Sequence, residues 1–162
     1  MARDLVETTL THLKKYNVDR IVLSPKLWKA CKLPVSLNWS VVKYHKSQKS
    51  KLPKSQGVYT FVVKPGIVNH PECAYVMYVG KTEKQTFRER FSQYFIEEKN
   101  PKGREHIKIM AKFWKDNLWY CYAPVANVNL IDDIEDQLRN AFVPPYNREF
   151  RGTIGKARKA WS

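Results

Sequence analysis

Two short runs of β-branched and aromatic residues dominate the hydrophobic pattern of the middle of the chain. They are GVYTFVV at residues 57–63 and AYVMYVG at residues 74–80, and the turn-forming segment KPGIVNHPEC lies between them. Runs of this composition that are separated by a turn segment are typical of paired strands. The pattern therefore predicts an antiparallel hairpin.

The rest of the pattern predicts three helices and one further strand. Thr82 and Gln85 have the spacing of a capping box, which predicts a helix from there to about residue 98. A second helix is predicted within 103–117, a strand at 118–125 and a last helix at 129–142. The order β-β-α-α-β-α predicts an α/β (α+β) domain, with a small three-stranded antiparallel sheet flanked by helices.

The segment before residue 57 has a weaker pattern. Residues 20–24, RIVLS, favour a strand, and residues 43–56 are typical of a basic loop. A short amphipathic helix is predicted from residues that recur at helical spacing, namely Leu5, Val6, Thr9, Leu10 and Leu13. The predicted organisation is an N-terminal arm (1–56), a folded domain (57–150) and a basic C-terminal tail (151–162).

The N-terminal arm carries a large share of the positive charge of the chain. The net charge is +14, and the segment from Arg20 to Gln56 contains nine basic residues and no acid. A surface this basic attracts polyanions, of which nucleic acid is the commonest. The predicted nucleic-acid contacts are Lys43, Lys46, Lys49, Lys51 and Lys54 in the arm and Arg148, Arg151, Lys156 and Arg158 near the C-terminus. Trp28, Trp39 and Tyr44 interleave with the arm, where they either stack on bases or anchor the arm to the core.

Several features argue against a membrane or secreted protein. No run of about 18 apolar residues is present, so no membrane span is expected. The first residues include acids and lack a small-residue cleavage site, unlike a secretory signal. The cysteines are odd in number and widely spaced, which favours reduced thiols and a cytoplasmic location.

One carboxylate of the last predicted helix has an unusual position. With about 100° per residue, the apolar residues from Ile131 to Phe142 cover about one third of the circumference. Glu135 lies about 20° from Phe142, at the edge of that face. The three aspartates of the helix point away from it: Asp132, Asp133 and Asp136. Glu135 either reaches water at the periphery or meets a cation, a metal or a donor there.

The helix that follows the hairpin presents a similar choice. Its aromatic residues share one face, and Arg88 and Arg90 flank that face on opposite edges. Either arginine can project over the hairpin, and helical geometry alone does not choose between them.

Taken together, these segments resemble the GIY-YIG endonuclease family. Gly57-Val58-Tyr59 and Tyr78-Val79-Gly80 resemble its two paired signatures. Three further segments follow in the family's order, namely KTEKQTFRERF, a later helix with Glu135, and the segment that ends in Asn147. The resemblance covers about residues 57–150. The chain departs from the family in having Val at the middle of both signatures and a longer connection, with 18 residues between the two tyrosines.

The resemblance implies a role for each matching residue. Tyr59 would be the general base or would position the attacking water, and Tyr78 would assist by hydrogen bonding. Arg90 would contact phosphate oxygens, with Lys81 beside it, and these cations would offset part of the cost of ionising the phenol. Glu135 would hold a single Mg²⁺ or Mn²⁺ ion, since hydrated Mg²⁺ often takes one or two protein carboxylates. Supporting roles would fall to Gly57, Gly80, Arg88, Tyr94 and Asn147.

The function that follows is a metal-dependent DNA endonuclease that hydrolyses phosphodiester bonds. The length favours a small stand-alone restriction-type or defence nuclease, and a palindromic double-strand cutter would act as a homodimer. The alternatives are a non-catalytic basic nucleic-acid-binding protein with the same fold and a nicking nuclease of the homing or repair type.

Overall fold

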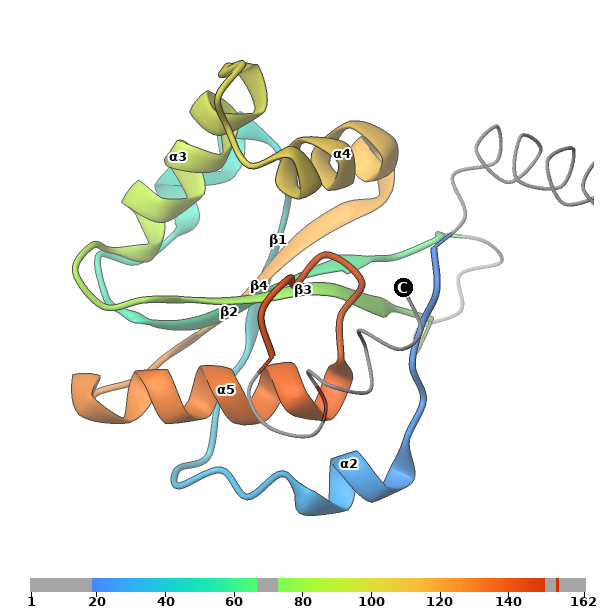
Figure 1. The fold of residues 1–162 in the computed structure, drawn as a ribbon. Coiled ribbons are helices and arrows are strands. Elements are labelled where there is room, and N and C mark those ends of the chain that lie inside the picture. Colours follow the sequence, from blue (N-terminus) through green and yellow to red (C-terminus); the bar gives the residue numbers. More distant parts are fainter. Residues whose placement is uncertain (1–18, 67–72, 151–153, 155–162) are drawn as a thin grey trace, which may run out of the picture.

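The strands form one antiparallel sheet in the order β1-β4-β2-β3 (Figure 1). The computed structural model describes residues 19–66, 73–150 and 154. The strands are β1 Ser40–Lys43, β2 Gly57–Val63, β3 Tyr75–Thr82 and β4 Leu118–Pro124. The mixed α/β class and the hairpin of β2 and β3 are confirmed, but the sheet has four strands rather than the predicted three.

Helices cover both faces of the sheet. In Figure 1, α3 and α4 lie on one face, α5 lies on the other, and α2 packs against α5. The helices are α2 Pro25–Ala30, α3 Phe87–Lys99, α4 Glu105–Trp114 and α5 Ile131–Phe142, with 3₁₀ turns η1 Lys46–Lys51, η3 Lys115–Asn117 and η4 Val128–Leu130. The sheet therefore separates two apolar cores.

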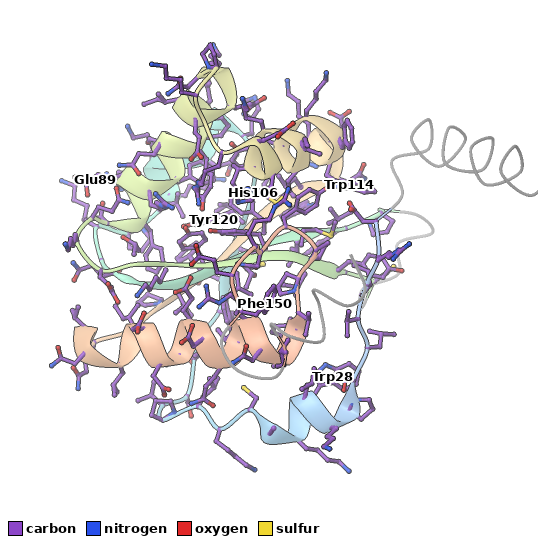
Figure 2. All side chains as sticks on the ribbon, viewed as in Figure 1. Trp28, Glu89, His106, Trp114, Tyr120 and Phe150 are labelled. Atoms are coloured by element: carbon purple, nitrogen blue, oxygen red, sulfur yellow. The ribbon has the colours of Figure 1, made fainter. Side chains whose placement is uncertain are left out.

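Strand β2 forms the centre of both cores. All seven of its residues are buried, because β4 and β3 flank it and helices cover it above and below. Tyr59 and Phe61 point into the aromatic core under α3 and α4, together with Tyr120 of β4 (Figure 2). Val58 points the other way, into the aliphatic core under α5. The alternation of a strand thus distributes one continuous apolar run between two layers.

The fourth strand, β1, comes from the predicted arm. It pairs with β4, with Val42 opposite Tyr120. Sequence reasoning missed it because it is four residues long and the segment that follows it is dominated by lysine. That segment contains η1 instead of a plain loop, and the strand predicted at residues 20–24 does not form.

Helix α3 begins four residues later than predicted. Thr82 is the last residue of β3, opposite Gly57, and its hydroxyl donates to the carbonyl of Gln85 within the turn. The capping box is formed by Thr86 and Glu89, whose side chains bind each other's backbone amides. Thr82 and Thr86 both have the spacing of a capping box, and pairing with β2 keeps Thr82 extended.

Some predictions fall outside the described residues. These are the helix around Leu5–Leu13 and the basic tail with Arg151, Lys156 and Arg158. In the described part of the chain, no helix is long and apolar enough to cross a membrane.

Candidate active site

The residues to which the resemblance gives catalytic roles meet at the edge of the sheet that β3 forms. A pocket of about 320 Å³ at this edge is lined by Tyr59, Tyr78, Lys81, Thr82, Glu83, Lys84, Gln85, Arg90 and Glu135. Strand alternation places Tyr78 on the α3/α4 side, whereas Lys81 contacts acids of α5. The pocket therefore spans β3, with the tyrosines and the Arg90 guanidinium on one side and carboxylates on the other.

Tyr59 is fully buried, and its hydroxyl belongs to a short hydrogen-bonded chain. Arg90 Nε donates to the Tyr59 hydroxyl at 3.0 Å, and the hydroxyl of Tyr94 lies 2.7 Å away. The ring stacks on Tyr120, with 5.0 Å between the centroids. Packing and hydrogen bonds thus fix both the ring and the phenolic oxygen.

Gly80 is the residue of β3 directly opposite Tyr59. A Cβ atom at Gly80 would lie 2.6 Å from both Cζ and the hydroxyl oxygen of Tyr59. The absence of a side chain therefore lets the Tyr59 ring lie across β3. The glycine to which the resemblance gives a supporting role thus makes room for the tyrosine. Gly57, at the other end of the pairing, is similarly enclosed, since a Cβ there would lie 2.2 Å from the carbonyl oxygen of Ala123.

The phenol of Tyr59 is harder to ionise than a free one. Burial is the main cause and raises its pKa to about 12, although Arg90 acts in the opposite direction. Arg90 thus lowers the pKa of Tyr59, as expected of a neighbouring cation, but burial raises that pKa by more. Lys81 lines the same pocket as Tyr59 and binds carboxylates there: its Nζ donates to Glu83 at 2.8 Å and to Asp132. Burial likewise raises the pKa of Tyr78 and that of Tyr94.

The structure distinguishes the two arginines of α3. Arg90 points over the hairpin to Tyr59. Arg88 donates from Nε to the carbonyl of Leu52 at 3.0 Å and from Nη2 to that of Ser50 at 2.8 Å. Arg88 thereby ties α3 to η1, and its guanidinium is engaged by backbone rather than by the pocket.

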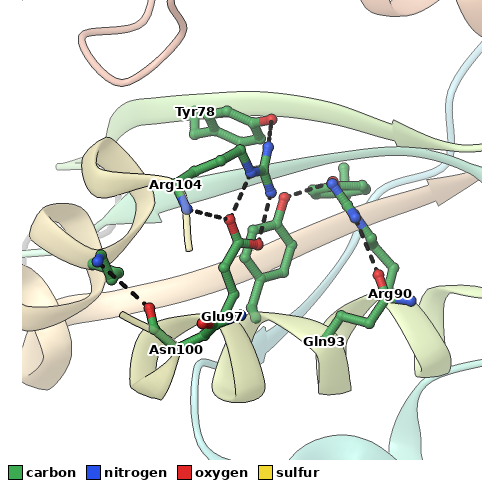
Figure 3. Close-up of polar contacts among 9 residues, drawn as sticks. Tyr78, Arg90, Gln93, Glu97, Asn100 and Arg104 are labelled. Atoms are coloured by element: carbon green, nitrogen blue, oxygen red, sulfur yellow. Dashed lines mark hydrogen bonds and ion pairs between the residues drawn. The ribbon is translucent and has the colours of Figure 1, made fainter. Parts of the chain in front are cut away.

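A second guanidinium beside the tyrosines was not foreseen. Arg104, just before α4, donates from Nη1 to the Tyr78 hydroxyl at 3.3 Å and lies over the ring of Tyr94, 5.8 Å from its centroid (Figure 3). Glu97 holds it through Nε at 2.7 Å and Nη2 at 3.0 Å. No pattern marks Arg104 in the sequence, because it lies in the turn between two helices and is positioned by tertiary contacts alone.

Glu135 lies on the α5 side of the pocket. It is buried, with 8% of its surface exposed, and Lys81 Nζ lies 3.9 Å from its Oε2. Burial raises the pKa of its carboxyl, while Arg139 and Lys81 lower it. The residue therefore does not simply reach water at the periphery.

The three aspartates of α5 differ from one another. Asp133 is exposed, as predicted, and Asp132 is partly exposed beside Lys81. The prediction for Asp136 is wrong, since its side chain is only 14% exposed and forms a salt bridge with Arg139. A charge that its own helix can neutralise is thus tolerated near the packed face.

Glu135 has the properties expected of a single-carboxylate ligand for a hydrated divalent ion. Its carboxylate lines an open polar pocket. Burial raises its pKa by more than Arg139 and Lys81 lower it, so its negative charge is disfavoured. No group of three or more His, Cys, Asp or Glu side chains that could hold a metal occurs among the described residues. A divalent ion held by Glu135 would therefore keep most of its water ligands, as Mg²⁺ does.

Asn147 acts on the backbone between the two signature residues of β3. Its side-chain oxygen accepts from the amide of Val79 at 2.8 Å, and its side-chain nitrogen donates to the carbonyl of Val79 at 2.8 Å. Val79 stands between Tyr78 and Gly80 on the edge strand. Asn147 therefore substitutes for a neighbouring strand and fixes the path of β3 at the site.

The basic residues predicted to bind nucleic acid lie in different surroundings. Lys43 donates to the carbonyl of Asp116 and lies over Trp119, so it has a structural contact. The other described members of the set are exposed: Lys46, Lys49, Lys51, Lys54 and Arg148. Of the arm aromatics, Tyr44 is buried in the core, whereas Trp28 and Trp39 are 44% and 43% exposed.

Comparisons with protein-family models, with curated proteins and with solved structures give no match for this chain.

Proposed function

We propose that the protein is a metal-dependent DNA endonuclease that resembles the GIY-YIG enzymes. The observation that carries the proposal is the pocket at the β3 edge. Tyr59, Tyr78 and Arg90 line this pocket on one side of the edge strand, and Glu135 lines it on the other side. Glu135 is at least 45 positions away from each of them in the sequence. These are the residues that the resemblance assigns to the chemistry. The strongly basic surface supplies the affinity for a polyanion.

The side chains suggest a division of labour around a phosphodiester. Hydrolysis forms a bond from a water oxygen to phosphorus and breaks the bond to the leaving oxygen. With a pKa of about 12, ionising Tyr59 at pH 7 costs about 7 kcal/mol. We therefore assign its neutral hydroxyl to orienting the water rather than to acting as a resting phenolate.

The guanidinium groups would stabilise the charge that develops on the phosphate. Arg90 lies at the pocket and already donates to the Tyr59 hydroxyl, so it can bridge that hydroxyl and a phosphate oxygen. Arg104 holds the hydroxyl of Tyr78 from the other end of α3. A divalent ion on Glu135 would supply Lewis-acid stabilisation of the phosphoryl and leaving oxygens.

Supercoiled plasmid incubated with Mg²⁺, with Mn²⁺ or with EDTA tests the proposal. We expect divalent-dependent cutting by the wild type and a loss of about 100-fold or more for Glu135→Gln and for Arg90→Met. Asp133→Asn is the matched control for Glu135, because it removes an exposed carboxylate from the same helix. Tyr120→Phe is the control for Tyr59→Phe, because the buried hydroxyl of Tyr120 has no hydrogen-bond partner among the residues that the structure describes. Absence of cutting by the wild type with either metal would refute the enzyme, and nicked or linear products would separate a nicking from a double-strand nuclease.

One observation favours a second function, a nucleic-acid-binding protein without catalysis. Lys81 contacts Glu83, Asp132 and Glu135, so a cation of the chain itself already neutralises the carboxylate side of the pocket. This reading predicts salt-sensitive binding of DNA with no cutting under any metal. The same plasmid assay distinguishes the two functions.

A further inference from the structure

A groove separate from the candidate active site lies between η1 and α3. Its volume is about 440 Å³, and its lining residues are Lys46, Lys49, Ser92, Phe95, Ile96 and Lys99. None of them lines the pocket at the β3 edge. The groove thus presents apolar side chains of α3 between lysines of two different elements.

The floor of the groove is an immobilised aromatic ring. Phe95 stacks on Tyr44, with 4.4 Å between the centroids and an angle of 5° between the planes. Tyr44 is itself 5% exposed, so the stack is anchored in the core. Ile96 beside it is 67% exposed, an unusual position for a large apolar side chain. A fixed aromatic ring at the base of an open groove is a platform on which a planar ligand can stack.

The rim of the groove is positively charged. Lys46 Nζ lies 5.9 Å from the centroid of the Phe95 ring, Lys49 follows on η1, and Lys99 is in the last turn of α3. None of these three lysines forms a salt bridge with any residue that the structure describes. The pKa of Glu89 is lowered mainly by its hydrogen bonds to Thr86, and Lys49 makes only a smaller contribution. The rim therefore retains its charge for an anionic ligand.

We propose that this groove binds an unpaired nucleotide of a nucleic acid, with the base against Phe95 and the flanking phosphates on Lys46, Lys49 and Lys99. Lysines alone would suit any polyanion, but the stacked ring adds an affinity for a base that is free of its partner. Duplex DNA hides its base faces, so the preferred ligand is single-stranded. The inference rests on the proposed function only in taking nucleic acid as the ligand.

The position of the groove relative to the pocket supports this assignment. Arg90 lines the pocket and Phe95 lines the groove, and both belong to α3. They are five residues apart, which is about 7.5 Å along the helix axis and about 140° around it. A strand whose phosphate lies at Arg90 can therefore continue over α3 into the groove.

Fluorescence anisotropy with a labelled ten-nucleotide single strand and a blunt duplex of equal length, both in EDTA, tests the proposal. We expect Phe95→Leu to weaken binding of the single strand by about fivefold or more and to change duplex affinity by less than about twofold. The double variant Lys46→Met/Lys99→Met should reduce the slope of log K against log salt by about 0.7 per lost phosphate contact of the single strand. Lys112→Met/Lys115→Met, which removes two exposed charges elsewhere, is the control.

Three results would overturn the proposal. The first is unchanged single-strand binding by Phe95→Leu together with an unchanged salt slope for the lysine variant. The second is an equal loss of affinity for the single strand and the duplex. The third is Phe95-dependent binding of deca-glutamate as tight as that of the oligonucleotide, which would assign the groove to an acidic protein segment. The lysine variant keeps the test valid if Phe95→Leu does not fold. Because EDTA prevents metal-dependent cutting, binding and cleavage are tested separately. An effect of Phe95→Leu on binding without plasmid cleavage by the wild type would support the groove and refute the nuclease. Plasmid cleavage without an effect of Phe95→Leu on binding would support the nuclease and refute the groove.

Discussion

Glu135 is predicted to lower the stability of the metal-free protein. Its pKa is raised in the folded state, mainly by burial, so the carboxylate form is disfavoured there. A raised carboxyl pKa means that the folded state binds more protons than the unfolded state, and stability falls as the pH rises through that window. We therefore expect Glu135→Gln to have a higher Tm than the wild type at pH 7 in EDTA, with the difference vanishing at a pH well below the ordinary value of 4.5.

Calorimetry at several pH values measures this effect, and Asp133→Asn provides the exposed control. Addition of Mg²⁺ should then raise the Tm of the wild type but not that of Glu135→Gln, because only a ligand that binds the folded state stabilises it. A Tm of Glu135→Gln below that of the wild type at pH 7 would contradict the assignment of Glu135 as an electrostatically costly residue.

Gly80 and Tyr59 are predicted to be energetically coupled. Gly80→Ala places a Cβ 2.6 Å from the Tyr59 ring, whose other side is held by Tyr120. We expect a loss of about 1–3 kcal/mol in the free energy of unfolding, as for other overpacked sites, measured by urea denaturation. In a Tyr59→Leu background the same change should cost much less, and the double-mutant cycle gives the coupling. Equal losses in both backgrounds would show that the ring is not what the glycine accommodates.

At the scale of elements, β3 depends on a side chain for its outer hydrogen bonds. Asn147 satisfies both the amide and the carbonyl of Val79 at the edge of the sheet, where Val79 is buried. We expect Asn147→Ala to lower the free energy of unfolding by about 1–3 kcal/mol and to speed hydrogen exchange at the Val79 amide. Asn140→Ala is a suitable control, because the side-chain oxygen of Asn140 is buried and accepts no hydrogen bond from the described part of the chain. Unchanged exchange at Val79 would contradict the role of Asn147.

The elements that were predictable from the sequence are those with a strong local pattern. The run GVYTFVV is β2 itself, and the amphipathic period of 131–142 gave α5 and the edge position of Glu135. Strand β1 was not predictable, because its four residues derive their structure from pairing with β4 rather than from their own pattern. The start of α3 was misplaced because the pairing of Thr82 with Gly57 overrides a suitable local cap.

The candidate site was predictable to a similar extent. The sequence alone identifies the residues that resemble a family signature, and the structure brings Tyr59, Arg90 and Glu135 to one pocket. Helical geometry alone did not distinguish Arg90 from Arg88, since the choice depends on carbonyls of a segment far away in the chain. Arg104 was missed for the same reason, because the tyrosine that it contacts and the glutamate that holds it lie on separate elements.

At the scale of the whole molecule, the arm and the core share one sheet. Residues 40–43 pair with β4, and Tyr44 and Leu52 are 5% and 0% exposed. A fragment that begins at residue 57 would lack these core side chains and would leave an edge of β4 unpaired. We expect such a fragment to give no cooperative thermal transition, whereas the full chain melts in one step, as judged by circular dichroism. A cooperative transition of the fragment would instead support the boundary predicted at residue 57.

The distribution of charge over the molecule leads to a prediction on DNA affinity. The triple variant Lys46→Met/Lys49→Met/Lys51→Met changes the net charge by the same amount as Lys102→Met/Lys112→Met/Lys115→Met, and all six lysines are exposed. If η1 contacts the phosphate backbone, only the first variant should lower the slope of log K against log salt for a duplex, by about 0.9 per lost phosphate contact.

The paired design separates local contact from the overall field. Long-range attraction depends on net charge and is screened beyond about 8 Å at physiological ionic strength, so it acts almost equally on the two variants. Filter binding at several salt concentrations gives both slopes. Equal slopes for the two variants would mean that the net charge of +14, rather than the position of η1, sets the affinity of this protein for DNA.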